Sequence, residues 1–246
     1  MIKEALEYIV GMSKPNCIEK GDNTYSDKPL TRVDYDPAPE AIKTNTLTSI
    51  LEYVNTDADN IQDCKLLIHV ESPTRVCVQS YLNTNMRRNK YMAAEADIPK
   101  ILFGTFIPLE EFKIMLASCF ADSDEAHMTS KEDLLSFLSN VQVGTVADYG
   151  DDGISQKAEV KKGISGAGRE EKLAPNPVEL CPFRSFQEIY PVKSSFIFRM
   201  KEQNGVILCA LFEADGGAWK NDCRRDIAGF LMDHLKNTES RFHVLY

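Results

Sequence analysis

The residues whose types and spacing could do chemistry are concentrated between Pro177 and Trp219. Two carboxylates, Glu213 and Asp215, end an apolar run just before a Gly-Gly pair. Carboxylates at the end of a strand could act as a general acid/base pair. They could equally be held by upstream arginines that lock a proline-rich loop onto a hairpin. We favour the second interpretation, because this stretch lacks the catalytic motifs that enzyme sites build around a His, a Cys, a Ser or a metal ion.

This interpretation predicts a structural network and no catalytic residues. The members of the network are Arg184, Glu188, Arg199, Glu213, Asp215 and Trp219. We therefore expect the chain not to be an enzyme. An enzyme built on Glu213 and Asp215 stays open as the alternative.

A second candidate for binding is a basic cluster formed by Arg87, Arg88 and Lys90. We expect it on a hairpin tip or an exposed loop, where it could be solvated, contact another subunit, or bind phosphate. Its only aromatic neighbours are Tyr81 and Tyr91, too few for a base-stacking platform. The chain carries a net charge of -9 and has a pI near 5.1, which argues against a broad nucleic-acid-binding face. Nucleic acid is thus an alternative partner that we do not favour.

Metal and cofactor motifs are weak in this sequence. Asp148, Asp151 and Asp152 lack the alternating spacing of a calcium loop, and a turn rich in Asp and Gly needs no metal. The glycines of residues 163–168 lead into a segment too short and polar for a phosphate-binding helix. We interpret His69 as a sheet histidine. We expect no metal site and no cofactor.

The seven cysteines are scattered without C-x-x-C spacing. An odd count without such pairs predicts reduced thiols used as small core residues, with no disulfide framework and no zinc site.

The elements that position these residues predict an α+β fold with a mixed, mostly antiparallel sheet and packed helices. Ser194–Met200 alternates in polarity, Val206–Phe212 is apolar, and Asn204-Gly205 between them favours chain reversal, so we expect a hairpin. The other expected helices span about residues 2–12, 46–55, 108–120, 130–139 and 222–236. The other expected strands span about residues 66–70, 75–82, 98–107 and 241–246, with a hairpin over 141–162.

The N-terminal region differs from the rest of the chain. Residues 13–41 are polar and rich in Pro, Asp and Asn, which predicts an extended or disordered arm. We divide the chain into an N-terminal helix and arm, 1–45, and a single α+β domain, 46–246. An ordered arm of this composition has to be tied down, either on its own domain or across a neighbouring subunit.

One family resemblance emerges from the C-terminal half. The residues that carry it are Asn176-Pro177, Pro182–Ile189, Pro191, Phe196–Arg199 and Phe212–Gly217. This succession resembles the YfdQ-like family of bacteriophage and prophage proteins. The order of elements upstream is also similar, so the resemblance covers about residues 40–236. It implies a phage or prophage origin and gives no residue a role.

These observations lead to one functional hypothesis. With 43% apolar and 26% charged residues, the composition is that of an ordinary globular protein. It contains no long apolar run, and its N-terminus lacks the features of a secretory signal, so we expect no membrane contact and a location in the bacterial cytoplasm. We predict a non-enzymatic phage or prophage protein that acts by self-assembly, as a homo-oligomeric structural or interaction protein. Its predicted partner is itself, and a phage or host protein is an additional candidate. The alternative is an accessory factor of phage DNA metabolism, or a protein that sequesters nucleotides or counters host defence.

Overall fold

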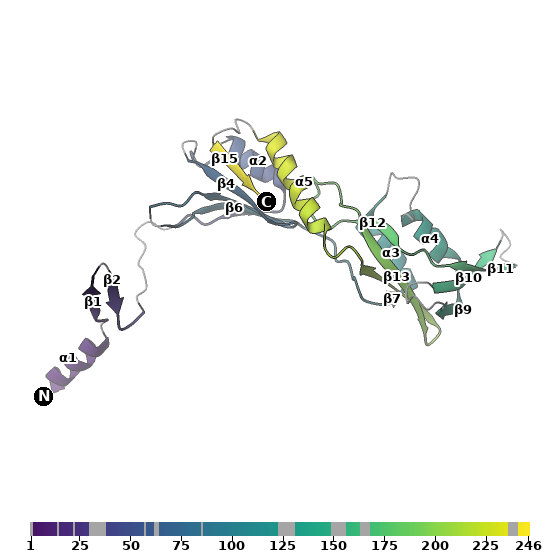
Figure 1. Cartoon of the computed structure of the whole chain (residues 1–246), viewed down its shortest axis with the longest axis horizontal. Helices are drawn as coiled ribbons and strands as arrows, with labels where there is room; N and C mark the ends of the chain where they lie inside the picture. Colours follow the sequence, from purple (N-terminus) through teal and green to yellow (C-terminus); the bar gives the residue numbers. More distant parts are fainter. Residues whose placement is uncertain are drawn as a thin grey trace. The chain divides into compact units, whose positions relative to one another are not determined.

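The computed structural model describes residues 2–13, 15–21, 23–29, 38–56, 58–61, 64–84, 86–122, 131–148, 156–162, 168–235 and 241–246. The chain forms two compact units, Met1–Ala38 and Pro39–Tyr246 (Figure 1). The second unit starts earlier than residue 46, where the sequence placed the domain boundary, because Ile42–Thr44 is a strand of its first sheet. The fold is α+β, as predicted.

The N-terminal unit contains a helix and a hairpin. Helix α1 (Ile2–Ser13) confirms the predicted helix. Strands β1 (Cys17–Lys20) and β2 (Asn23–Ser26) pair antiparallel, whereas the sequence predicted only an extended arm. The Asp27 carboxylate accepts a hydrogen bond from the Asn16 backbone N–H at 2.7 Å and thereby closes the base of the hairpin. Gly21 supplies the positive φ of 64° that the turn needs.

The first sheet of the C-terminal unit has the order β15-β4-β5-β6-β3. Its strands are β3 (Ile42–Thr44), β4 (Leu66–Ser72), β5 (Arg75–Ser80), β6 (Lys90–Glu95) and β15 (Phe242–Leu245). β4, β5 and β6 form an antiparallel meander, and the two edge strands are parallel to their neighbours. The sheet is therefore mixed and mostly antiparallel, as predicted.

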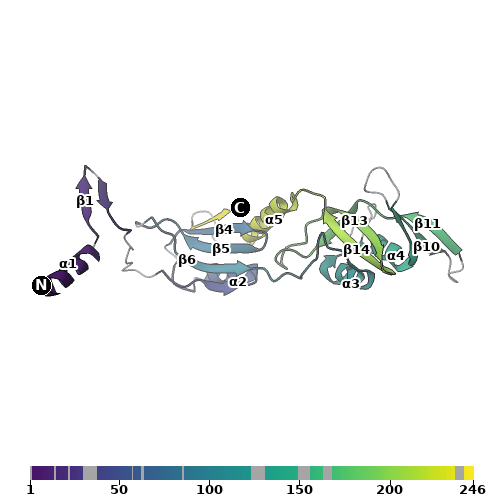
Figure 2. The ribbon, with the colours of Figure 1, turned by 90° about the horizontal axis from the view of Figure 1, so that it is seen from below.

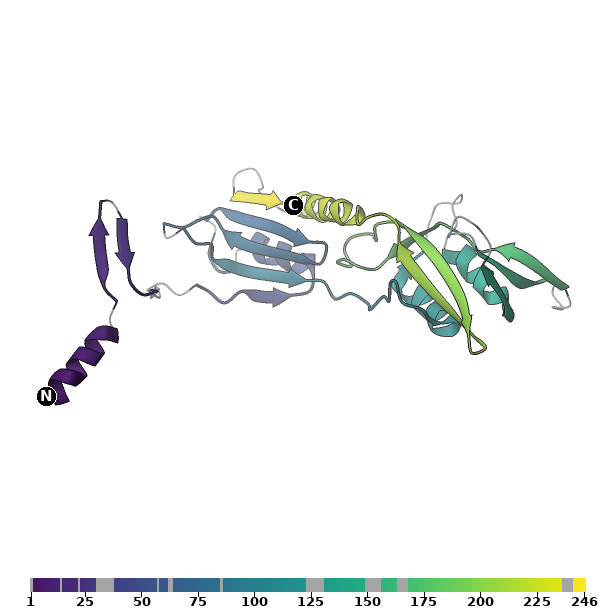
Figure 3. The ribbon, with the colours of Figure 1, turned by 60° about the horizontal axis from the view of Figure 1, so that its bottom comes forward.

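Two helices bury one face of this sheet. Helices α2 (Leu47–Thr56) and α5 (Trp219–His234) pack against alternate residues of β4, β5 and β6, and Figure 3 shows α2 behind the strands. In β4 the residues that face this core are Leu66, Ile68 and Val70. His69 and Glu71, on the other parity, therefore lie on the opposite face.

The second sheet has the order β7-β14-β13-β12-β8. Its strands are β7 (Ile107–Pro108), β8 (Phe120–Ala121), β12 (Val178–Pro182), β13 (Ser194–Gln203) and β14 (Val206–Glu213). A second hydrophobic core joins it to α3 (Leu109–Cys119) and α4 (Lys131–Asn140). Figure 2 shows both helices beside the β13 and β14 strands. Strands β9 (Val141–Asp148), β10 (Gln156–Lys162) and β11 (Gly168–Leu173) form a separate three-stranded sheet.

The β13–β14 hairpin confirms the sequence prediction. Asn204 and Gly205 have φ values of 53° and 76°, so both residues of the tight turn are left-handed. Phe196, Phe198 and Met200 point into the second core because they alternate with more exposed residues. The Asn176 side chain pairs with both backbone groups of Phe198, at 2.7 and 2.9 Å.

Several segments differ from the sequence prediction. The apolar run 98–107 was predicted as a strand, but only Ile107 and Pro108 pair with another strand. The run is used for its side chains: Phe103 stacks on Phe196 with ring centroids 5.3 Å apart. Strands β6, β11 and β12 were not predicted, because their short or polar sequences lack a clear alternation.

Residues 183–193, which we name the strap, connect the second sheet to the first core. Phe186 and Ile189 are buried among the residues of the first core. The Ser185 hydroxyl donates a hydrogen bond to the Pro73 carbonyl at 2.6 Å. The strap thus ties the two cores of the C-terminal unit together.

Candidate functional site

The predicted network centres on Arg184, whose side chain is only 8% exposed. Its Nη1 donates to Glu213 Oε1 at 2.8 Å, and its Nη2 donates to the Ser194 hydroxyl. The guanidinium carbon lies 3.6 Å from the centroid of the Trp219 ring, a close cation–π contact. Arg184 therefore joins the strap to the ends of β13 and β14 and to the first turn of α5.

Asp215 lies beside this group at the turn that leads into α5. Its Oδ1 accepts a hydrogen bond from the Gly217 backbone N–H at 2.9 Å, and Gly216 and Gly217 have positive φ values of 63° and 81°. Burial raises the pKa of Asp215, but hydrogen bonds from Ser194 and Gly217 and the charge of Arg184 outweigh it, so the pKa is below its usual value. Asp215 is consequently ionised at neutral pH.

The chemistry of this network is that of an ion-paired structural lock. Burial lowers the pKa of Arg184, while the Glu213 and Asp215 carboxylates act in the opposite direction. The guanidinium nevertheless stays charged, since arginine starts from a very high pKa. A general acid needs a raised carboxyl pKa, and Asp215 is shifted the other way. The arrangement favours the structural interpretation of these residues.

The remaining two predicted members lie elsewhere. Glu188 Oε1 accepts hydrogen bonds from the backbone N–H and the hydroxyl of Thr48, at 3.0 and 3.2 Å, so its charge lies at the N-terminus of α2. Arg199 is opposite Ala210 in the hairpin, whereas Glu213 is opposite Phe196. Successive strand residues face opposite sides, so Arg199 lies on the face of the hairpin away from Glu213.

The basic cluster lies on the exposed connection between β5 and β6 and at the start of β6. Arg87 and Arg88 are exposed. Arg88 Nη1 donates to the Ser80 carbonyl at 3.1 Å, and Lys90 Nζ lies 3.8 Å from Glu71 Oε1. Arg88 and Lys90 are therefore engaged within the chain, which weakens the case for a phosphate-binding surface.

The other weak candidates are only partly described. Asp148 is the last residue of β9, while Asp151 and Asp152 lie outside the described residues, as do residues 163–167. All seven cysteines are free, and five of them are buried, which agrees with the prediction of reduced core thiols.

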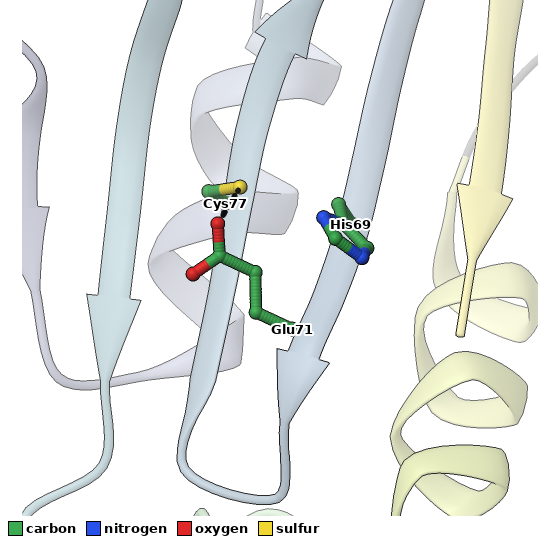
Figure 4. A group of neighbouring side chains, drawn as sticks. All are labelled: His69, Glu71 and Cys77. Carbon is green, nitrogen blue, oxygen red and sulfur yellow. Dashed lines mark hydrogen bonds between the residues drawn. The ribbon is translucent and has the colours of Figure 1, made fainter.

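The structure also brings together three residues that the sequence analysis did not combine. His69, Glu71 and Cys77 offer one ligand atom each, and these atoms lie within 4.8 Å of one another (Figure 4). His69 and Glu71 alternate on β4, and Cys77 is directly opposite His69 on β5. The signal in the sequence was a His-x-Glu pair followed by a tight turn and a Cys at the matching register. The sequence analysis missed the group because it depends on the register between β4 and β5.

This cluster has a defined electrostatic surrounding. The Cys77 thiol donates to Glu71 Oε1 at 3.3 Å, and Arg75 Nε contacts Glu71 Oε2 at 3.0 Å. Burial and the neighbouring Glu71 raise the pKa of the Cys77 thiol to about 11. Cys77 is therefore a neutral thiol at neutral pH and does not have the reactivity of a catalytic thiolate.

A cavity of about 760 Å³ opens beside the strap. Most of its lining comes from residues 183–191, and the other side is formed by Asp97, Pro99, Ser118 and Ala121. Phe183 and Tyr190 are 40% and 63% exposed, so two aromatic side chains border it without being covered. Such an apolar opening is suited to receiving apolar side chains.

Comparison with protein-family models, with curated proteins and with solved structures finds no match to this chain. Its function therefore has to be inferred from its own residues. None of the helices in the described part of the chain combines the length and the apolar character needed to cross a lipid bilayer.

Proposed function

We propose that this chain is a phage- or prophage-encoded protein that acts without catalysis, by assembling with copies of itself. The N-terminal unit of one copy binds the C-terminal unit of another. The observation that carries this proposal is the exposure of the N-terminal unit: of its described side chains, none is buried. The resemblance to the YfdQ-like family supports the phage or prophage origin.

Five of the described exposed side chains of this unit are large and apolar or aromatic. Leu6, Tyr8 and Val10 of α1 are 57%, 71% and 57% exposed, and Ile18 and Tyr25 of the hairpin are 66% and 56% exposed. Covering each of them would contribute about 1.5–3 kcal/mol at full burial.

The helix and the hairpin of this unit are too small to be stable without a surface that covers them. A helix of 12 residues is marginal in water by itself, and so is an isolated two-stranded hairpin. Both gain stability only by burying an apolar face against something else. A second copy of the chain is the partner that is always present at equal concentration.

The C-terminal unit offers a matching acceptor in the cavity beside the strap. Phe183 and Tyr190 at its border supply exposed aromatic surface, and its volume of about 760 Å³ is enough for several side chains. An N-terminal unit that binds the C-terminal unit of another copy makes a head-to-tail contact. Such contacts produce rings or extended assemblies.

The test is the native mass of variants of the N-terminal unit, measured by light scattering. Replacing Leu6, Tyr8 and Val10 by serine in one variant should reduce the mass to that of the monomer. The matched control carries Lys3→Ser and Glu7→Ser, which change the same helix without removing apolar area or net charge, and should keep the mass of the unmodified chain. Equal masses for both variants would contradict the role of the N-terminal unit in self-association.

The acceptor is tested separately. Phe183→Ser with Tyr190→Ser should also reduce the mass, while Met232→Ser, an exposed apolar residue of α5, should not. Self-association should change little with salt, because apolar contacts drive it. A strongly salt-dependent binding of oligonucleotides, abolished by replacing Arg87 and Arg88, would instead support the alternative role in phage DNA metabolism.

A further inference from the structure

We propose that His69, Glu71 and Cys77 form a binding site for a divalent transition-metal ion, best suited to Zn²⁺. The three side chains supply one imidazole nitrogen, one carboxylate oxygen and one sulfur. These are the ligand types that zinc uses in proteins, whereas calcium and magnesium prefer oxygen alone. The site is distinct from the arm and from the Arg184 network.

The sheet itself sets the geometry of the three ligands. His69 and Glu71 lie two residues apart on β4, so they share a face, and Cys77 is the direct partner of His69 on β5. The core residues of these strands face α2 and α5, which leaves the three ligands together on the other face (Figure 4). His69 and Cys77 therefore lie at paired positions of the ladder, and Glu71 lies at the register shift between Val70 and Ser72.

The distances are compatible with a closed site. Bonds of about 2.0–2.3 Å to a tetrahedral zinc ion place neighbouring ligand atoms about 3.5 Å apart. The ligand atoms lie within 4.8 Å of one another without the ion, and the Cys77 to Glu71 pair is already at 3.3 Å. The His69 and Glu71 side chains are only half-buried, so they can rotate and bring their ligand atoms to the separation that the ion requires.

The surroundings hold the carboxylate in place. Arg75 contacts Oε2 of Glu71, while Oε1 is the oxygen that faces Cys77. A second contact of this kind orients a metal ligand and leaves the other oxygen free to coordinate. Lys90 also lies near Oε1, and it has to move outward when the ion binds.

Binding exchanges a proton for the metal ion. The Cys77 thiol loses the proton that it donates to Glu71, and its sulfur then bonds to the ion as a thiolate. Three protein ligands leave a fourth coordination position. Water can reach that position because His69 and Glu71 are partly exposed.

The experiment is a titration of the full chain with Co²⁺, which reports sulfur ligation by an intense charge-transfer absorption, followed by displacement with Zn²⁺. The exposed thiols Cys17 and Cys64 are first replaced by serine to remove other sulfur ligands. We expect one ion per chain. Cys77→Ser should abolish the charge-transfer band, and His69→Ala should weaken binding by more than 100-fold.

Two further variants keep the result decisive. Arg75→Met should weaken Zn²⁺ binding by about 10- to 100-fold, the usual effect of losing an outer contact. His243→Ala removes an exposed histidine from the neighbouring strand β15 and should leave binding unchanged. The proposal would be overturned if the charge-transfer band is absent from the protein that keeps His69, Glu71 and Cys77. It would also be overturned if the band survives Cys77→Ser. If circular dichroism shows that the Cys77→Ser variant is unfolded, Glu71→Gln becomes the deciding variant. An unchanged metal affinity of Glu71→Gln would then overturn the proposal.

Discussion

Replacing Arg184 by methionine tests the structural lock of the C-terminal unit. Methionine keeps much of the aliphatic stem but removes the charge that contacts Glu213, Ser194 and Trp219. We expect Arg184→Met to lower the free energy of unfolding of this unit substantially. The reason is that the substitution removes a close cation–π contact and leaves two former partners without a donor.

The magnitude follows from the three contacts. A desolvated cation–π pair contributes about 2 kcal/mol. The hydrogen bond to Ser194 contributes about 1 kcal/mol. The ion pair with Glu213 is discounted to at most about 1 kcal/mol, because that carboxylate is 40% exposed. The expected loss is therefore about 3 kcal/mol, which shifts the urea midpoint by about 1 M for an m-value of about 3 kcal/mol/M.

The assay is urea unfolding followed by tryptophan fluorescence. Trp219 is the only tryptophan in the chain, so its emission reports the network itself. The matched control is Arg225→Met on α5, the helix that also carries Trp219. Arg225 is 65% exposed and pairs with Asp222, so this substitution should change the free energy of unfolding by less than about 0.5 kcal/mol. If Arg184→Met leaves both the midpoint and the emission of Trp219 unchanged, the lock does not exist.

Three further predictions concern the same unit. Phe198→Ala should lower the free energy of unfolding by about 3–5 kcal/mol, since Phe198 is fully buried in the second core; thermal unfolding measures this, and a loss below about 1 kcal/mol would argue against that core. Gly205→Ala should cost about 1 kcal/mol because its φ is 76°, whereas Val206→Ala next to it should cost less; equal values would contradict the turn. Asp215 has a lowered pKa, so it stabilises the fold at neutral pH and loses that contribution as the pH falls through its folded-state pKa. Asp215→Asn should therefore be less stable than the unmodified chain at pH 7, with a difference that shrinks in acid; a constant difference would refute this assignment.

Periodic patterns allowed much of the fold to be predicted. The β13–β14 hairpin was predicted from alternation and an Asn-Gly turn, and both are present. Helices α2, α3 and α5 follow their apolar spacing, to within a few residues at each end. In these segments the local pattern and the tertiary contacts require the same structure.

Other elements depend on contacts that no local pattern contains. Strand β12 begins next to Asn176, and its pairing is fixed by β13 and β8, which are distant in sequence. Residues 98–106 have a strand-like composition, yet Phe103 packs on Phe196 without a ladder. Tertiary burial decides such segments, and propensity does not.

The candidate sites show the same division. Arg184, Glu213 and Trp219 were expected together, and the structure places Arg184 in contact with each of the other two. Glu188 was assigned to the same group because it is close in sequence, but it caps α2 instead. The His69 to Cys77 pairing depends on the register of a hairpin, which becomes visible only when the two strands are aligned.

The most direct test of the account is the native mass of the full chain, measured by light scattering over a range of concentrations and followed by electron microscopy. The proposed exchange of N-terminal units predicts a regular assembly whose mass is a multiple of 27.7 kDa. It also predicts that a chain starting at Pro39 forms a smaller assembly, with fewer copies, than the full chain does. A single species of 27.7 kDa at every concentration would contradict self-assembly as the function.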